Sequence, residues 1–296
     1  MLKFFENNME NYKTTKSYRS FINSPYRSIK HKSYFACYDI LLEEYIGKDI
    51  TFVEIGVLDG GSLFMWRDFF GENARIIGIE INESAKVWRD HGFEIFLGGQ
   101  GDPHFWENFY NEVGSVDVVL DDGGHTYQQQ IVTVDSSLEH INHGGKIIVE
   151  DTYTSYQTEY GYPSNHTFTK YAYNLVDGIN LRTPKIKTKG KTNNIISNIS
   201  FFESIVSVNI NHNYELDLAE GLPNKGIILE RSADSLRYED KPTLTRANNI
   251  IASFKVLQSV PLIGSSLKNL GVFITNVFKI INNKIDNFKL RKYFRY

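Results

Sequence analysis

The chain of 296 residues is poor in cysteine, in net charge and in long hydrophobic runs. Cys37 is its only cysteine, which excludes an intramolecular disulfide framework and fits a reducing compartment. A formal net charge of −3 provides no overall basic field, so we expect no nucleic-acid partner. The most apolar late stretch, residues 260–281, is interrupted by lysines and asparagines, which argues against a membrane-spanning helix.

The remaining composition is that of a globular protein. Hydrophobic residues make up 41% of the chain and aromatic residues 14%, enough to bury the core of a catalytic domain with appendages. Residues 1–16 interrupt their few apolar side chains with charges and amides, so they lack the apolar centre of a secretory signal. We therefore expect a cytoplasmic protein, with a place at the inner face of the membrane as an alternative.

The region from Thr51 to about Ser155 repeats an apolar strand, a glycine-rich or acidic turn and a helix. This order is typical of βαβ units, and right-handed crossovers then predict a doubly wound, Rossmann-like α/β sheet. A helical spacing of apolar residues over 34–46 predicts an N-terminal helical cap within residues 1–48. The strands are expected at 52–56, 76–81, 94–97, 116–121 and 146–150.

The segment 156–183 is rich in Tyr, Asn, Thr and Gly and predicts a long loop near the site. Two apolar runs, 199–208 and 225–230, predict late antiparallel strands that complete the sheet. The central domain is therefore expected to span residues 49–235.

Residues 236–296 predict a helical, basic tail. Apolar residues from Ile263 to Phe288 recur at steps of three and four, while lysines occupy the opposite face. Such a helix can dock on its own domain or on a partner subunit, which would make a homo-oligomer. The alternative is an anionic membrane surface, because basic and aromatic side chains together suit the headgroup layer.

A cofactor pocket is indicated by VEIGVLDGGS at 53–62. Glycines there allow a close backbone approach, and N–H groups at a helix start point toward a ligand. An acidic Glu54 would repel pyrophosphate but attract the cationic amino-acid part of S-adenosylmethionine. Glu80, at the end of the second strand, is placed to accept hydrogen bonds from ribose hydroxyls, or is a solvated carboxylate at the rim. The predicted cofactor contacts are Glu54, Gly56, Gly60, Ser62, Glu80, Gln100 and Asp121.

Acidic residues also end the fourth and fifth strands, as Asp121-Asp122 and Glu150-Asp151, with His125 on the turn between. Neighbouring parallel strands bring these ends together, and the crowded negative charge requires a compensating cation. Oxygen ligands favour Mg²⁺. Since adjacent strand residues face opposite ways, Asp122 is the better ligand of its pair. His125 suits a general base, although a histidine bonded to backbone at a helix start is the alternative.

Three ordered motifs carry a family resemblance: EIGVLDGGSLFMWRDFF beginning at Glu54, LDDGGH ending at His125, and VEDTYTSY beginning at Val149. Over about 30–208 the chain resembles the metal-dependent macrolide-sugar O-methyltransferases and their cephalosporin-hydroxylase-like relatives, which are class I S-adenosylmethionine-dependent methyltransferases. The family commonly has a Lys and Tyr pair before the first strand, to which Lys30 and Tyr34 correspond. Gly124 departs from its usual Ser.

By this resemblance, Asp122, Glu150 and Asp151 would bind Mg²⁺, His125 and Asp122 would be catalytic, and the residues named above would surround S-adenosylmethionine. The expected reaction is O-methylation of a sugar hydroxyl on a glycan, a glycolipid precursor or a glycosylated metabolite, as in polysaccharide biosynthesis. A non-catalytic S-adenosylmethionine-binding scaffold remains an alternative. An iron oxygenase is less favoured, because no site of two histidines and one carboxylate is visible.

Overall fold

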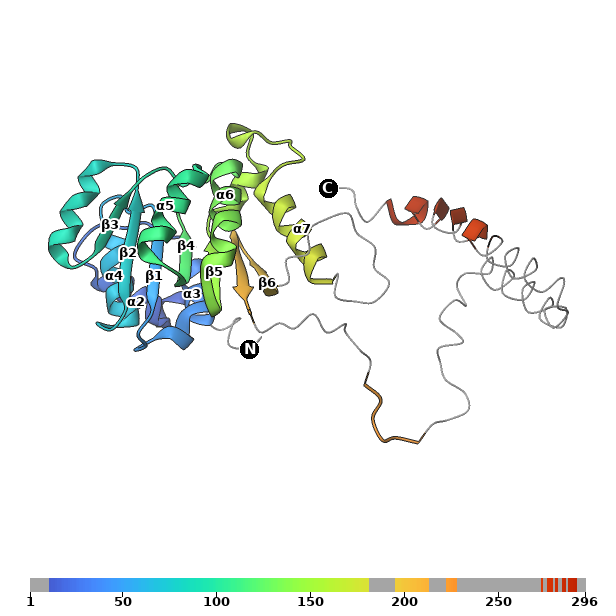
Figure 1. Ribbon diagram of the computed structural model, residues 1–296, viewed down its shortest axis with the longest axis horizontal. Helices are drawn as coiled ribbons and strands as arrows, with labels where there is room; N and C mark the ends of the chain where they lie inside the picture. Colours follow the sequence, from blue (N-terminus) through green and yellow to red (C-terminus); the bar gives the residue numbers. More distant parts are fainter. Residues whose placement is uncertain are drawn as a thin grey trace, which may run out of the picture. The chain divides into compact units, whose positions relative to one another are not determined.

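A computed structural model describes residues 11–180, 195–212 and 222–227, together with positions 273, 276–278, 280–281, 284–285 and 287–291. The chain divides into two compact units, residues 1–221 and 222–296. The first unit contains the sheet and all the helices and strands labelled in Figure 1.

The first unit is built on a seven-stranded sheet with the order β3-β2-β1-β4-β5-β7-β6. Strands β1 to β5 are parallel, whereas β7 pairs antiparallel with both β5 and β6. The strand order reverses between β1 and β4: β2 and β3 lie on one side of this point, and β5 lies on the other. The carboxyl ends of β1 and β4 therefore open a crevice there. The strands are β1 Thr51–Ile55, β2 Arg75–Glu80, β3 Glu94–Leu97, β4 Val116–Asp121, β5 Ile141–Val149, β6 Ile196–Phe202 and β7 Ile205–Ile210. The predicted doubly wound sheet is confirmed.

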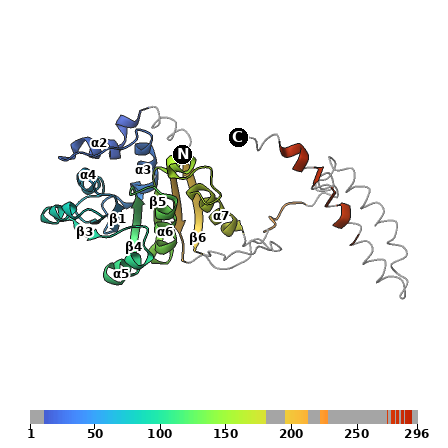
Figure 2. The ribbon, with the colours of Figure 1, turned by 90° about the horizontal axis from the view of Figure 1, so that it is seen from above.

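Helices cover both faces of this sheet (Figure 2). Alternate strand residues feed separate cores: Phe52 of β1 packs on the side of the N-terminal helices, and its neighbour Val53 packs on the opposite side. Burial on both faces explains why the strands read as continuous apolar runs. One face carries α2 Lys16–Asn23, α3 Tyr34–Leu42 and α4 Gly61–Phe70, and the other carries α5 Pro103–Val113, α6 Tyr127–Ser137 and α7 Phe168–Asn180.

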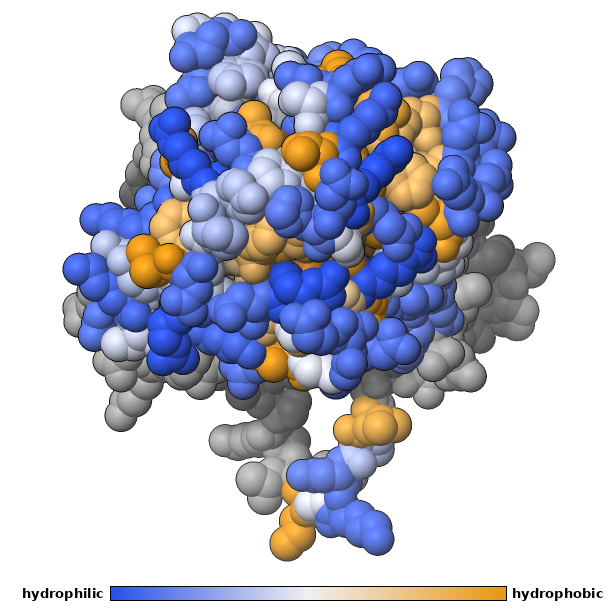
Figure 3. Space-filling view, turned by 90° about the vertical axis from the view of Figure 1, so that its left-hand side faces the viewer, coloured by the Kyte–Doolittle hydropathy of each residue, from blue (hydrophilic) through white to orange (hydrophobic). Residues whose placement is uncertain are grey.

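Short 3₁₀ segments complete the first unit: η1 Tyr12–Thr14, η2 Glu43–Tyr45, η3 Glu83–His91, η4 Leu138–His140, η5 Thr152–Tyr156 and η6 Thr158–Tyr160. The surface in Figure 3 is mainly hydrophilic and is interrupted by separate hydrophobic patches. Apolar residues scattered over the surface in this way are normal in folded proteins.

The N-terminal region is helical, as predicted, but it contains a helix that the sequence pattern did not reveal. Helix α2 begins where the Asp39 carboxylate of α3 accepts hydrogen bonds from the backbone N–H groups of Lys16 and Ser17, at 2.8 and 2.9 Å. Between α2 and α3, residues 24–31 contain no regular helix or strand. We call residues 24–31 the strap. It belongs to the same compact unit as the sheet.

Two predicted segments differ in the structure. The loop expected over 156–183 is wrong over 168–180, where the structure has helix α7, and residues 181–183 lie outside the described residues. Phe168 and Ala172 are buried, and Leu175 and Ile179 pack against the same core, a helical spacing that the surrounding polar residues obscured.

The late strands also need correction. The run 199–208 is not one strand but part of a hairpin, in which Ser204 has a φ of 60° and β6 turns into β7. The described part of the second run, 225–227, contains no strand, and residues 228–230 lie outside the described residues.

In the second unit, the described positions from 273 to 290 are helical, consistent with the predicted tail, while the rest of the apolar stripe lies outside the described residues. Most of their apolar side chains, including Phe273 and Phe288, are exposed. Within the described parts of the chain, no helix combines the length and hydropathy needed to span a bilayer. The expected boundaries at 48/49 and 235/236 stay predictions.

Candidate active site

A cavity of about 460 Å³ lies at the carboxyl ends of the parallel strands. One part is lined by the residues that follow β1, β2 and β3, including Gly56, Glu80 and Gln100. Another part is lined by the residues that follow β4 and β5 and by Ile29 and His31 of the strap. A smaller cavity of about 200 Å³ adjoins it and includes Ser62. The sheet therefore brings several of the predicted site residues to one opening.

Glu80 faces this cavity and joins two of its loops. Its Oε2 atom accepts hydrogen bonds from the backbone N–H groups of Val57 and Leu58, at 3.0 and 3.1 Å. Its Oε1 atom accepts from those of Ile81 and Asn82, at 2.8 and 3.1 Å. Burial raises the pKa of Glu80, but these hydrogen bonds outweigh it and hold the pKa below its ordinary value. Glu80 therefore stays ionised at the edge of the cavity.

The turn from β1 to α4 needs its glycines for packing. Gly56 has a φ of 91°, and a Cβ atom there would lie 2.1 Å from the backbone oxygen of Asp122. Gly60 has a φ of 78° and precedes α4 as its N-cap, and a Cβ atom there would overlap the Trp88 ring. Both residues were predicted as cofactor contacts, and Gly56 lines the larger cavity. The glycine pattern reflects close contact of the chain with itself as well as space for a ligand.

Glu54 lines neither cavity. Its carboxylate is buried and accepts hydrogen bonds from Ser62 Oγ at 2.7 Å and Trp66 Nε1 at 3.0 Å. Burial raises the pKa of Glu54 to about 7, although Lys30, Ser62 and Trp66 act to lower it. The structure therefore gives Glu54 hydrogen-bond partners inside the protein, and its cofactor contact stays a prediction.

Gln100 stabilises the turn after β4 through hydrogen bonds. Its Nε2 atom donates to Asp121 Oδ1 at 2.8 Å, and its Oε1 atom accepts from the backbone N–H of Gly124 at 2.8 Å. Gly123 also donates its N–H to Asp121 Oδ1, at 3.2 Å. Gln100 lines the cavity, whereas Asp121 is fully buried and does not. Both were predicted as cofactor contacts, and they hold the turn that carries Asp122 and His125.

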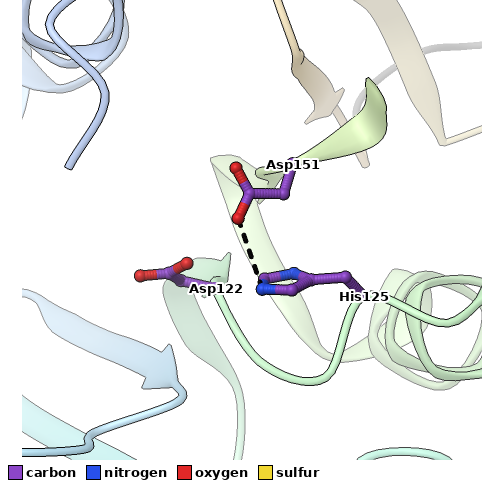
Figure 4. A group of neighbouring side chains, drawn as sticks. All are labelled: Asp122, His125 and Asp151. Atoms are coloured by element: carbon purple, nitrogen blue, oxygen red, sulfur yellow. Dashed lines mark ion pairs between the residues drawn. The ribbon is translucent and has the colours of Figure 1, made fainter. Parts of the chain in front are cut away.

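Asp122, His125 and Asp151 converge on the cavity (Figure 4). Each offers a ligand atom within 4.8 Å of the others, and His125 Nε2 lies 3.3 Å from Asp151 Oδ2. His125 and Asp151 have φ values of 60° and 54°, a backbone conformation that costs non-glycine residues energy. His125 Nδ1 is buried without a hydrogen-bond partner among the described residues. Strain of this kind is concentrated at functional sites.

Glu150, predicted as a metal ligand, lies outside this cluster. It is buried and accepts hydrogen bonds from Tyr38 Oη at 2.5 Å and from Lys30 Nζ at 3.2 Å. Lys30 also donates to Asp122 Oδ2 at 2.7 Å and lies 3.8 Å from Glu54. Burial lowers the pKa of Lys30, but the surrounding carboxylates raise it by more than burial lowers it. The net pKa lies above its ordinary value, so the ammonium stays charged.

Lys30 thus supplies part of the positive charge that the sequence argument assigned wholly to a metal. Tyr34 donates its Oη proton to Asp151, so the Lys30 and Tyr34 pair does reach the strand ends. Sequence reasoning missed Tyr38 and the two cavity residues His31 and Tyr153. The available signal for Tyr153 was the tyrosine-rich TYTSY run after Asp151. The available signal for His31 was its position next to Lys30, because neighbouring side chains of an extended segment point to opposite sides.

Residues 53–152 match the family model described as a methyltransferase domain. The 8-demethyl-8-alpha-L-rhamnosyl tetracenomycin-C 2'-O-methyltransferase of Streptomyces olivaceus is 29% identical, over 50% of this chain and 41% of the relative. The demethylmacrocin O-methyltransferase of Streptomyces fradiae is 28% identical, over 42% of this chain and 33% of the relative. The chain thus spans less than half the length of these curated relatives.

Among solved structures, the MycE methyltransferase from the mycinamycin biosynthetic pathway, in complex with Mg, SAH and mycinamycin VI, is similar in fold. Its TM-score is 0.59 at 24% identity, and the match covers 76% of this chain and 58% of that one. The Rossmann-like methyltransferase fold is thereby confirmed. The matched residues 53–152 contain the first two of the three motifs and the start of the third.

Proposed function

We propose that the protein is an S-adenosylmethionine-dependent O-methyltransferase that modifies a hydroxyl of a sugar-containing acceptor. The observation that carries this proposal is the convergence of Asp122, His125 and Asp151 on the same cavity as Glu80. Two relatives named above are O-methyltransferases, and the name of one specifies a rhamnosyl tetracenomycin. The acceptor is then a sugar on a metabolite, a glycan or a glycolipid precursor.

The cofactor proposal depends on the part of the cavity around Glu80. An ionised carboxylate at the end of β2 suits ribose hydroxyls, and Gly99, which lines the same cavity and has no neighbour within 4 Å of its Cβ position, leaves room for a flat base. The cavity also lies at the reversal of strand order, where α/β sheets bind ligands. Its negative residues favour a cationic sulfonium donor over a pyrophosphate.

The donor set also fits a hard divalent cation. Asp122 and Asp151 present carboxylate oxygens to the cavity, and oxygen ligands are those that Mg²⁺ prefers. Glu150 is not proposed as a ligand, because Tyr38 and Lys30 already occupy its buried oxygens. Bound there, Mg²⁺ would stabilise negative charge developing on the acceptor oxygen.

His125 is the proposed general base. Its Nε2 atom faces the cavity beside Asp151, where a neutral imidazole accepts the proton of the acceptor hydroxyl as the methyl group moves from sulfur to oxygen. Lys30 keeps Asp122 in place from the inner side, and Tyr34 does the same for Asp151. Gln100 fixes the turn that presents both Asp122 and His125.

The test measures transfer of a labelled methyl group from S-adenosylmethionine to a set of glycosylated metabolites and glycans, with Mg²⁺ and with a chelator. We expect chelation and Asp122→Asn to abolish transfer, and His125→Ala to reduce it by about 10²- to 10⁴-fold. Glu159→Gln and His104→Ala replace exposed side chains outside the cavity and serve as controls. Transfer that survives both the chelator and the variants would reject this mechanism.

For the tail, we propose docking on a second copy of the chain, with the protein in the cytoplasm. Exposed apolar side chains at Phe273, Ile280 and Phe288 support a surface that is covered in use. Light scattering should then give a dimer or higher oligomer that becomes monomeric when the three positions are changed to serine. Binding to anionic vesicles by a monomeric protein would instead favour the membrane alternative.

A further inference from the structure

We propose that His31 and Tyr153 form the acceptor subsite, in which a pyranose ring stacks on Tyr153 and the His31 imidazole hydrogen-bonds one of its hydroxyls. This inference rests on the proposed function and names the part of the cavity that holds the sugar. It assigns roles to two residues that the motifs did not single out.

The strap places His31 beside the cavity. Lys30 is buried and bound to Asp122 and Glu150, at 2.7 and 3.2 Å, while its neighbours Ile29 and His31 both line the cavity. The strap is therefore fixed from the inner side by an ion pair, and the two residues that flank the lysine are presented to the opening. The wall that carries His31 is in place before any ligand arrives.

The two rings form a corner. Their centroids are 5.8 Å apart with an interplanar angle of 72°, so one ring stands nearly at right angles to the other. The His31 side chain is 59% exposed and Tyr153 is 36% exposed. A saturated ring that enters this corner meets an aromatic face on one side and a ring nitrogen on the other. This combination suits a sugar, which has apolar C–H faces and hydroxyls at its edge.

The corner also lies next to the catalytic group. Asp151 separates the two histidines: its Oδ1 atom is 3.9 Å from His31 Nε2, and its Oδ2 atom is 3.3 Å from His125 Nε2. A ring that contacts His31 with one hydroxyl therefore brings a nearby hydroxyl toward His125.

The test measures binding, without turnover, of methyl α-L-rhamnopyranoside and methyl α-D-glucopyranoside by NMR titration of the protein saturated with S-adenosylhomocysteine and Mg²⁺. We expect at least one glycoside to bind, and Tyr153→Ala and His31→Ala each to weaken it about five- to tenfold. Tyr153→Phe retains the aromatic face and should bind within twofold of the unchanged protein. S-adenosylhomocysteine affinity should stay within twofold in every variant, which also shows that each variant is folded.

Matched controls are available in the same segment and residue type. Tyr156 is 61% exposed and does not line the cavity, so Tyr156→Ala should leave glycoside binding unchanged. His104 is an exposed histidine on α5, and His104→Ala should do the same. Equal glycoside affinity in the Tyr153→Ala, His31→Ala and control variants overturns the subsite. Binding of S-adenosylhomocysteine with no glycoside bound also overturns it and leaves the methyltransferase intact, whereas loss of both removes the proposed function itself.

Discussion

The carboxylates at the edge of the sheet fall into two groups with different surroundings. Glu54, Asp121 and Glu150 are fully buried and each accepts hydrogen bonds from side chains of the protein. Glu80, Asp122 and Asp151 line the cavity instead. In each of the two adjacent pairs, Asp121-Asp122 and Glu150-Asp151, the first residue is buried and the second lines the cavity. The same kind of side chain thus serves internal bonding in one group and lines the proposed reaction site in the other.

The largest effect is expected from removing Lys30, the cation beside the buried carboxylates Glu54 and Glu150. Lys30→Met preserves most of the side-chain length but leaves Glu150 and Glu54 without their buried ammonium partner. We expect a loss of about 3–5 kcal/mol in the free energy of unfolding. Urea titration measures it, with the exposed Lys86→Met as control, which should change less than about 1 kcal/mol. A similarly small loss for Lys30→Met would contradict its assigned role.

The pH dependence of stability tests Glu54 directly. Burial raises its folded pKa to about 7 from an ordinary value of 4.5, so between these values the folded protein binds more protons than the unfolded chain. The contribution of Glu54 to stability therefore falls as pH rises through this window. Relative to the unchanged protein, Glu54→Gln should gain stability on the order of 3 kcal/mol as pH rises across that window. A difference between the two proteins that does not vary with pH would be inconsistent with this shift.

Backbone strain at the reaction site gives a smaller effect. Because His125 has a φ of 60°, His125→Gly should be more stable than His125→Ala by about 1 kcal/mol, although both lose activity. Thermal unfolding measures the difference. Ser204, with the same φ, lies in the β6–β7 turn, so Ser204→Gly should gain stability without losing activity. A glycine that stabilises neither position would show that these conformations carry no strain.

The smallest effect comes from the exposed carboxylate of Glu94, whose pKa is shifted in the direction opposite to that of Glu54. Glu94 accepts hydrogen bonds from Arg75, which hold its pKa below the ordinary value despite partial burial. Its stabilisation is therefore present above the unfolded pKa and is lost as pH falls through the folded pKa. Glu94→Gln should cost less than about 1 kcal/mol, and only at the higher pH. A cost that increases toward acid, measured by urea unfolding, would reverse this assignment.

Much of the fold was predictable because parallel strands are apolar on both faces. The strands 94–97 and 116–121 agree with β3 and β4 in both boundaries. Strand β5 begins earlier than predicted, at Ile141, because Asn142, His143 and Gly144 interrupt the apolar signal. Helix α7 was missed since only a narrow apolar stripe marks it.

The direction of each side chain at the site was less predictable. Alternation along a strand favoured Asp122 over Asp121, and the structure places Asp122 in the cluster. The same rule applied to Glu150 and Asp151 would have separated that pair too. What the local sequence did not contain was the long-range contact: Lys30 reaches Glu150 across 120 positions of the chain. No motif around β5 indicates that a distant lysine occupies its carboxylate.

The strap has a consequence for how this domain can be cut or transplanted. The family match begins at residue 53, but Lys30, Tyr34 and Tyr38, which bond the acids at the ends of β4 and β5, all precede it. A fragment trimmed to the matched boundaries would leave the buried carboxyl group of Glu150 without its donors Lys30 and Tyr38. A piece that keeps these bonds therefore begins before Lys30, and the boundaries of the family match are a poor guide for dissecting this protein.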